Sequence, residues 1–176
     1  MSGNIILIGM PGSGKSAAGR ALAKLLRRPL AETDAAAEKA AGMTIAEIFA
    51  KLGEKHFRAL ESAALETALG GGGKIISTGG GAVLAAKNRR HIRAAGTAVY
   101  LSAPPPLLEK RIAADAAPRP LLAKKDLGET LAALLEKREV LYRQTAHLEI
   151  VQDAEDAPAD VAEKIRAGLR HTGGAV

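Results

Sequence analysis

Short apolar runs alternate along this chain with longer segments in which apolar residues recur at helical spacing. The first run, residues 5–8, predicts a buried strand, and residues 17–26 after it predict an amphipathic helix. The same alternation predicts strands at 29–34, 74–78, 97–101 and 147–151, and helices at 35–41, 45–52, 54–69, 88–95, 107–113, 127–144 and 159–169. Strands that alternate with helices indicate an α/β fold with one parallel sheet covered on both faces.

Capping residues, glycines and prolines mark where these segments begin and end. Thr44 followed by Glu47 predicts a capping box at a helix start, and Gly53 predicts the end of that helix. We interpret the glycines at 70–73 as a connector rather than a binding loop. Prolines 118 and 120 exclude a regular helix nearby, so we place a mobile lid at about residues 112–126. The chain is otherwise one domain over residues 1–176, with residues 171–176 expected to be frayed.

Polar and glycine-rich segments follow several of the predicted strands. They are residues 9–16, 32–34, 79–81, Ser102 and the residues from Gln152 onward. Right-handed crossovers place the carboxyl ends of parallel strands along one edge, so we expect a ligand site at that edge. The glycine triplet at 79–81 would let a ligand or another loop approach the backbone closely, unless it is a plain loop.

Residues 9–16 read GMPGSGKS, which is the spacing G-x-x-x-x-G-K-S between a predicted strand and a predicted helix. The glycines allow backbone N–H groups to turn toward an anion, and the helix presents its positive end there. Lys15 can reach the terminal phosphates of a nucleotide, and the Ser16 hydroxyl can ligate magnesium. The alternative is a glycine-rich turn with an incidental lysine, but the flanking strand and helix favour binding of a nucleoside triphosphate.

Composition and charge narrow the classes of function. The 176 residues are 47% hydrophobic but only 2% aromatic, and the absence of cysteine excludes a disulfide framework and a thiol nucleophile. No apolar run approaches the ~20 residues that a membrane span needs, and no signal peptide is predicted before the first strand. The net charge of +6 would suit nucleic acid or anionic small substrates. Because single-strand recognition usually needs stacking aromatics, we expect neither a nucleic-acid nor a membrane partner.

Two carboxylates follow the second predicted strand. Glu32 and Asp34 lie two residues apart, so on a strand their side chains would leave the same face. One carboxylate near magnesium and one near a substrate hydroxyl is what phosphoryl transfer requires. The residues leave open the alternative that Asp34 only caps the helix predicted from residue 35.

Three arginines are further candidates for binding an anionic substrate or the transferred phosphate. Arg58 lies one helical turn from Glu61, close enough for the carboxylate to orient its guanidinium. Arg119 stands between two prolines, and Arg138 lies on the long helix at 127–144. Each arginine taken alone is more typical of a solvated surface charge. Brought together in one cleft, the three would suit a carboxylate substrate and a moving phosphate.

In its ordered motifs the chain resembles a shikimate kinase over residues 4–158. The motifs are the phosphate loop with Gly19-Arg20, the run Gly53-Glu54, Phe57-Arg58 and Glu61, the strand end Ile75-Ile76-Ser77 with Gly79-Gly80-Gly81, Arg119-Pro120-Leu121-Leu122, and Arg138 with Leu141-Tyr142. The resemblance implies a three-layer sandwich similar to nucleoside monophosphate kinases, with a five-stranded parallel sheet in the order 2-3-1-4-5. It also implies transfer of the γ-phosphoryl group of ATP to the 3-hydroxyl group of shikimate, with Mg²⁺ as cofactor.

The resemblance further implies a role for each matching residue. Asp34 would hold the shikimate hydroxyls and act as base, and Lys15 and Arg119 would be the other catalytic residues. The residues implied for shikimate are Asp34, Arg58, Gly79, Gly80, Gly81 and Arg138, the two arginines holding its carboxylate. The residues implied for the nucleotide are Gly12, Ser13, Gly14, Lys15, Ser16, Ala17 and Arg119, and those for the metal are Ser16 and Glu32. We expect a monomeric, cytoplasmic enzyme.

The chain departs from the family pattern at three places. Glu32 stands where Asp is usual, and Ala17 stands where a hydroxyl residue usually bonds a phosphate. The segment before Arg119 is short, which leaves Arg111 and the loop 153–158 as candidates for packing on adenine. Two other hypotheses are a gluconokinase-like or nucleotide-kinase-like enzyme, which would not need all three arginines, and a nucleotide-binding module that has lost catalysis.

Overall fold

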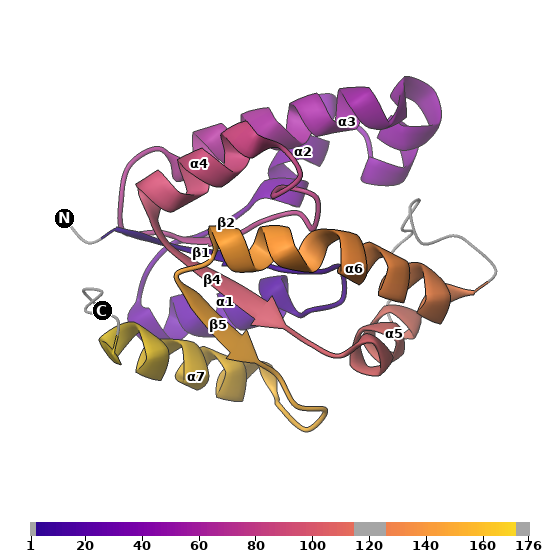
Figure 1. Ribbon diagram of the computed structural model, residues 1–176. Coiled ribbons are helices and arrows are strands. Elements are labelled where there is room, and N and C mark those ends of the chain that lie inside the picture. Colours follow the sequence, from indigo (N-terminus) through magenta and orange to yellow (C-terminus); the bar gives the residue numbers. More distant parts are fainter. Residues whose placement is uncertain (1–2, 115–125, 172–176) are drawn as a thin grey trace.

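Five parallel strands form one sheet in the computed structural model, which describes residues 3–114 and 126–171 (Figure 1). The strands are β1 (Asn4–Ile8), β2 (Leu30–Glu32), β3 (Ile75–Ser77), β4 (Gly96–Ser102) and β5 (Leu148–Val151). Their order across the sheet is β2-β3-β1-β4-β5, and every neighbouring pair is parallel. The predicted fold class and strand order are therefore confirmed.

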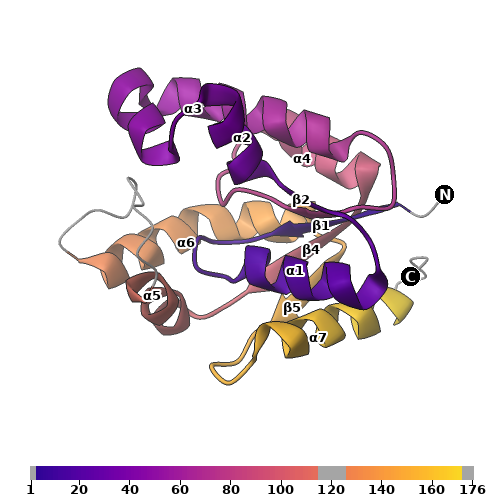
Figure 2. The ribbon, with the colours of Figure 1, turned by 180° about the vertical axis from the view of Figure 1, so that it is seen from behind.

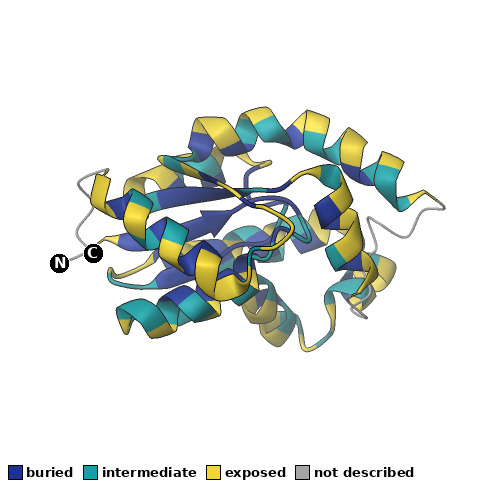
Figure 3. Cartoon of the chain, turned by 90° about the horizontal axis from the view of Figure 1, so that it is seen from below, coloured by how far each residue is buried: buried dark blue, intermediate teal, exposed yellow. Residues whose placement is uncertain are grey.

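Helices cover both faces of this sheet and complete three layers. They are α1 (Lys15–Leu26), α2 (Thr33–Ala41), α3 (Ile45–Leu69), α4 (Ala86–Ala95), α5 (Pro105–Ala113), α6 (Leu127–Thr145) and α7 (Pro158–His171). Alternate residues of β1 serve opposite layers: Ile5 and Leu7 pack with α1 and α7, whereas Ile6 and Ile8 pack with α3, α4 and α6. Figures 1 and 2 show these two helical layers on either side of the sheet. β1, β3 and most of β4 are buried between helices whose outward faces are exposed, whereas the edge strands β2 and β5 are only partly buried (Figure 3).

Local sequence signals account for the shape of α3. The Thr44 side chain accepts a hydrogen bond from the Glu47 N–H at 3.3 Å, and the Glu47 carboxylate accepts from the Thr44 N–H at 2.9 Å. This is the predicted capping box. Gly53 has φ 80° and ψ 169°, so the helix ladder breaks there and the two predicted helices lie on either side of a kink.

The change from β2 to α2 corrects two predictions about Asp34. β2 ends at Glu32 and α2 begins at Thr33, so Glu32 and Asp34 do not share a face of one strand. Nor does Asp34 cap the helix, because Glu32 occupies the N-cap position. Asp34 lies instead in the first turn of α2, where a negative charge is favoured by the helix dipole.

Most of the predicted lid lies outside the described residues. Of the predicted range 112–126, Ile112 is buried in α5, and Asp126 is the N-cap of α6, accepting from the Glu129 N–H at 2.8 Å. Arg119 and its neighbours are among the residues not described. At the other end, α7 continues to His171, beyond the end predicted at residue 169, and residues 172–176 are not described.

Candidate active site

The phosphate loop joins β1 to α1 at the carboxyl edge of the sheet. Gly12 and Gly14 have φ of 80° and 78°, left-handed values that residues with a Cβ rarely adopt. Gly14 is the N-cap of α1, so N–H groups of the first helical turn that lack helical partners open onto the loop. A Cβ on Gly9 would lie 2.7 Å from the carbonyl oxygen of Leu101, so the loop starts in close contact with β4. The sequence thus folds into the strand, loop and helix that a phosphate site requires.

Lys15 is held within the phosphate loop. Its Nζ donates to the carbonyl oxygens of Gly9 at 2.9 Å and Met10 at 2.8 Å, and to Ser13 Oγ at 3.4 Å. The side chains of Lys15 and Ser13 are both buried. These bonds place a positive charge at the loop and link its beginning to the start of α1.

Gln152 connects the phosphate loop to α5. It follows β5 and is 2% exposed, and its Nε2 donates to the carbonyl oxygen of Ser13 at 2.9 Å. Its Oε1 accepts from Arg111 Nη1 at 2.9 Å. A Cβ on Gly14 would lie 3.5 Å from that Arg111 nitrogen, so the guanidinium lies close to the last glycine of the loop.

Two hydroxyls meet at the start of α1, and one carboxylate pairs with a residue farther along the same helix. Ser16 Oγ and Ser77 Oγ are 3.4 Å apart, and Ser77 is paired with Glu32 in the register of β3 and β2. The Glu32 carboxylate forms an ion pair with the exposed Arg20 at 3.2 Å. Among the described residues no group of three or more His, Cys, Asp or Glu side chains could hold a metal ion. Mg²⁺ does not need such a group, because phosphate oxygens and water complete its shell when the protein supplies one or two oxygen ligands. The oxygens of Ser16, Ser77 and Glu32 are of the kind that Mg²⁺ prefers.

After β3, at the carboxyl edge of the sheet, Asp34 and Glu61 flank Gly79. A Cβ on Gly79 would lie 2.5 Å from Asp34 Oδ1 and 2.5 Å from Glu61 Oε1, so a larger residue would not fit. The Gly79 N–H donates to Thr33 Oγ1 at 3.0 Å, which ties the end of β3 to the start of α2. Burial raises the pKa of Glu61, an effect that Arg58 opposes and the Asp34 charge reinforces.

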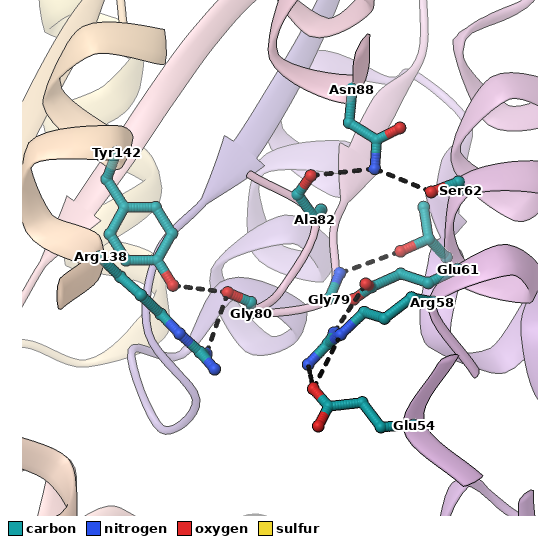
Figure 4. A network of polar contacts seen from close by, with 11 residues as sticks. Glu54, Arg58, Glu61, Ser62, Gly79, Gly80, Ala82, Asn88, Arg138 and Tyr142 are labelled. Carbon is teal, nitrogen blue, oxygen red and sulfur yellow. Dashed lines mark hydrogen bonds and ion pairs between the residues drawn. The ribbon is translucent and has the colours of Figure 1, made fainter. Parts of the chain in front are cut away.

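Arg58 extends from α3 toward the glycine triplet at 79–81. Its Nη1 donates to Glu61 Oε2 at 2.7 Å, and its Nε and Nη2 donate to Glu54 Oε1 at 3.3 and 3.1 Å (Figure 4). The Arg58 side chain is only 22% exposed. A Cβ on Gly81 would overlap its guanidinium. The prediction that Glu61 orients Arg58 is confirmed, and the alternative of a solvated surface charge is wrong.

Arg138 reaches the glycine triplet from the opposite side, on α6. It is 5% exposed, and its Nη1 donates to the carbonyl oxygen of Gly80 at 3.4 Å. The same oxygen accepts from the Tyr142 hydroxyl at 2.6 Å. Figure 4 shows Arg58 and Arg138 approaching the triplet from different helices. The alternative that Arg138 is a surface charge is therefore wrong as well.

The glycine triplet also contacts the phosphate loop. A Cβ on Gly80 would lie 2.8 Å from Cδ of Pro11, so the two loops pack with no room between them for a side chain. Close approach on both sides explains why glycines follow β3, and it contradicts the alternative of a plain loop. The phosphate loop and the residues around the triplet thus form one continuous site.

Comparisons with known proteins show which family the chain is similar to. A sequence profile described as "SKI: Shikimate kinase" matches residues 11–170. A shikimate kinase from Synechococcus sp. (strain JA-3-3Ab) is 42% identical over 161 residues, which cover 92% of this chain and 84% of the relative. One from Cereibacter sphaeroides is 44% identical over 165 residues, covering 94% and 81%.

A solved structure agrees as well. The shikimate kinase from Acinetobacter baumannii in complex with shikimate matches with a TM-score of 0.93 and 37% identity, covering 97% of this chain and 94% of that one. This chain belongs to the shikimate kinase family. The resemblance drawn from the sequence motifs is confirmed.

Three residues that connect parts of this shikimate kinase site appear in the sequence analysis, as members of the family motifs or of the expected ligand edge, but without a role for their side chains. The position of Ser77 at the end of β3, in register with Glu32, is the signal that could have indicated its place near Ser16. Tyr142 lies four residues after Arg138, which is the spacing of one helix face. Gln152 is the first residue after β5 and so lies at the predicted ligand edge. None of the three belongs to a motif whose pattern alone indicates its contacts.

Proposed function

We propose that this member of the shikimate kinase family transfers the γ-phosphoryl group of ATP to the 3-hydroxyl group of shikimate. The observation that supports this most is the meeting of the phosphate loop with a glycine triplet that Asp34, Arg58 and Arg138 approach from three helices. A carboxylate substrate with several hydroxyl groups calls for that combination of two guanidinium groups and one carboxylate.

The residues around the triplet would bind the acceptor. Arg58 and Arg138 hold the carboxylate of shikimate, and the backbone of Gly79, Gly80 and Gly81 lets the ring approach closely. Asp34 accepts hydrogen bonds from the hydroxyl groups and takes the proton as the 3-oxygen attacks. A positioned base of this kind contributes ~10²–10⁴-fold in rate.

The phosphate loop would bind the nucleotide. Backbone N–H groups of Gly12, Ser13, Gly14 and Ala17 surround the phosphates, and Lys15 brings a positive charge to the transferred group. Arg119, which lies outside the described residues, is assigned to substrate and phosphate by its motif. Arg111, which Gln152 holds beside Gly14, is our candidate for contact with adenine, together with the loop 153–158.

Ser16 and Glu32 would hold Mg²⁺, with Ser77 beside them. The metal neutralises charge on the β- and γ-phosphates when it is bound. Glu32 retains the negative charge of the usual Asp but is longer by one methylene, and its carboxylate is paired with Arg20. We therefore propose that Glu32 acts at the edge of the metal shell.

An acceptor panel tests the proposed function. ADP release with MgATP is measured in the presence of shikimate, gluconate and nucleoside monophosphates, and phosphorus NMR locates the new ester on the product. Shikimate-dependent release with the ester at the 3-oxygen is the expected result. Release with another acceptor would support the gluconokinase-like or nucleotide-kinase-like alternative. Nucleotide binding without any turnover would support a module that has lost catalysis.

We also propose that the enzyme is a cytoplasmic monomer that binds no nucleic acid. The lack of cysteine is compatible with a reducing compartment. In the part of the chain that the structure describes, no helix has the length and apolar character to cross a membrane. Sedimentation of the purified protein at increasing concentration tests the oligomeric state.

A further inference from the structure

Tyr142 contacts the glycine triplet, but it is not among the residues proposed to bind shikimate, ATP or Mg²⁺. Its hydroxyl donates to the carbonyl oxygen of Gly80 at 2.6 Å and lies 3.8 Å from Sδ of Met10 in the phosphate loop. The residue is fully buried, and its ring stacks on Tyr100 with 5.1 Å between centroids and 17° between planes. Burial raises the pKa of Tyr142, so the phenol remains a hydrogen-bond donor over the physiological pH range.

Arg138 donates to the same carbonyl oxygen. It lies four residues before Tyr142, on the same face of α6, and its Nη1 is 3.4 Å from the Gly80 oxygen. A bond of 2.6 Å between two oxygens is short and strong, whereas 3.4 Å is a long contact for a guanidinium. A carbonyl oxygen has two lone pairs and accepts from both groups, but the phenol makes the shorter bond, whereas the guanidinium is held only loosely.

The loop that carries the triplet is also held at its far end. Asn88 Nδ2 donates to the carbonyl oxygen of Ala82 at 3.0 Å and to Ser62 Oγ at 3.1 Å (Figure 4). Asn88 therefore ties the loop to α3, and Tyr142 ties it to α6. Of these two tethers, only Tyr142 shares its acceptor with an arginine that we assign to the substrate.

We propose that Tyr142 is a positioning residue for shikimate binding. It bonds the Gly80 carbonyl oxygen more closely than Arg138 does, fixes the glycine triplet, and so keeps the guanidinium of Arg138 available for the substrate carboxylate. This inference rests on the proposed function, because it assigns the acceptor site to shikimate. Tyr142 acts through Gly80 and Arg138, so its loss should affect acceptor affinity rather than nucleotide affinity.

The test compares Tyr142→Phe with Tyr100→Phe, which removes a hydroxyl from the other ring of the same buried stack. Losing one hydrogen bond to a site residue typically costs up to about tenfold, so we expect KM for shikimate to rise ~5–10-fold in Tyr142→Phe. KM for ATP and kcat should stay within about twofold of the parent. Tyr100→Phe should leave all three values near those of the parent, and thermal unfolding of both variants measures their stability.

A double-mutant cycle with Arg138→Lys tests the route through the arginine. If Tyr142 acts by keeping the guanidinium available, adding Tyr142→Phe to Arg138→Lys should raise KM for shikimate by less than twofold further, so that the effects are not additive. An unchanged KM for shikimate in Tyr142→Phe, an equal rise in KM for ATP, an equal effect of Tyr100→Phe, or fully additive effects would each overturn the proposal. Absence of shikimate turnover in the parent protein would instead refute the proposed function.

Discussion

The phosphate side and the acceptor side of this site are built in different ways. The phosphate loop is one continuous stretch, and Lys15 bonds carbonyl oxygens only five and six residues before it. On the acceptor side, Tyr142 bonds Gly80 across 62 residues of chain, and Arg138 bonds it across 58. A phosphate can be bound by neighbouring backbone amides, whereas a carboxylate and hydroxyl groups at different places on a ring require side chains from several elements.

This difference leads to different sensitivities. Glycine conformations and the start of α1 maintain the phosphate loop locally, so distant substitutions should disturb nucleotide binding little. The acceptor side depends on the packing of α2, α3 and α6 around the end of β3, so substitutions on any of these elements should alter binding of the acceptor. Each prediction below tests this separation, beginning with the largest expected effect.

Asp34→Asn should have the largest effect, because it removes the carboxylate that we assign as base. We expect kcat to fall at least ~10²-fold, while the affinity for ADP stays within about twofold. Steady-state turnover and calorimetric titration with ADP measure the two quantities. Asp160→Asn on α7 controls for the loss of one negative charge and should retain turnover. Near-normal turnover of Asp34→Asn would remove Asp34 from the role of base.

Arg58→Lys should weaken binding of the acceptor specifically. A lysine ammonium cannot make the planar two-point contact with a carboxylate, and it would break the fork that now joins Glu54 and Glu61. We expect KM for shikimate to rise roughly tenfold with little change in KM for ATP. Arg143→Lys, an exposed position on α6, is the matched control. A rise in KM for ATP of the same size would contradict the separation of the two sides.

Gln152→Leu should show the reverse pattern. It would leave the buried Ser13 carbonyl without its side-chain donor and release Arg111 from the position beside Gly14. An unsatisfied buried group costs about 1–3 kcal/mol, so we expect lower thermal stability and roughly fivefold weaker ADP binding. KM for shikimate should not change. Gln144→Leu, at an exposed position near the end of α6, controls for the added apolar surface, and weaker shikimate binding in Gln152→Leu would argue against our assignment.

His147 should affect stability without affecting either side of the site. Its Nδ1 accepts from the Ala98 N–H at 3.0 Å, and burial, assisted by the charge of Arg93, lowers the pKa of His147 below its usual 6.5. The unfolded chain therefore binds this proton more readily, so the stability contribution is present above pH 6.5 and is lost as pH falls through the lowered pKa. Because the ring is partly exposed, we expect the loss to be below about 1 kcal/mol.

The free energy of unfolding is measured by urea denaturation of the parent and of His147→Gln, at pH values above and below 6.5. The variant should lose part of the pH dependence and retain both KM values. An identical pH dependence of unfolding in the variant would show that the bond to the Ala98 N–H has no part in the effect.

Most of the fold was predictable because its signals are local. The alternation of strands and helices, the capping box of Thr44 and Glu47, and the break at Gly53 each depend on residues within one or two turns. The error at Asp34 has a local cause too. β2 is only three residues long, so its apolar pattern is too short to show that the helix begins at Thr33 rather than at residue 35.

In the site, too, the part that depends on neighbouring residues was predictable and the part that depends on distant residues was not. Residues 9–16 could be assigned to a phosphate from the chain alone, because the spacing of the glycines, the lysine and the serine specifies both the backbone turn and the groups that it presents. The convergence of Arg58 and Arg138 on Gly80 and Gly81, the position of Asp34 beside Glu61, and the bond from Tyr142 could not be assigned in that way. Helical spacing shows which residues share a face, but only the packing of helices on the sheet sets which faces meet.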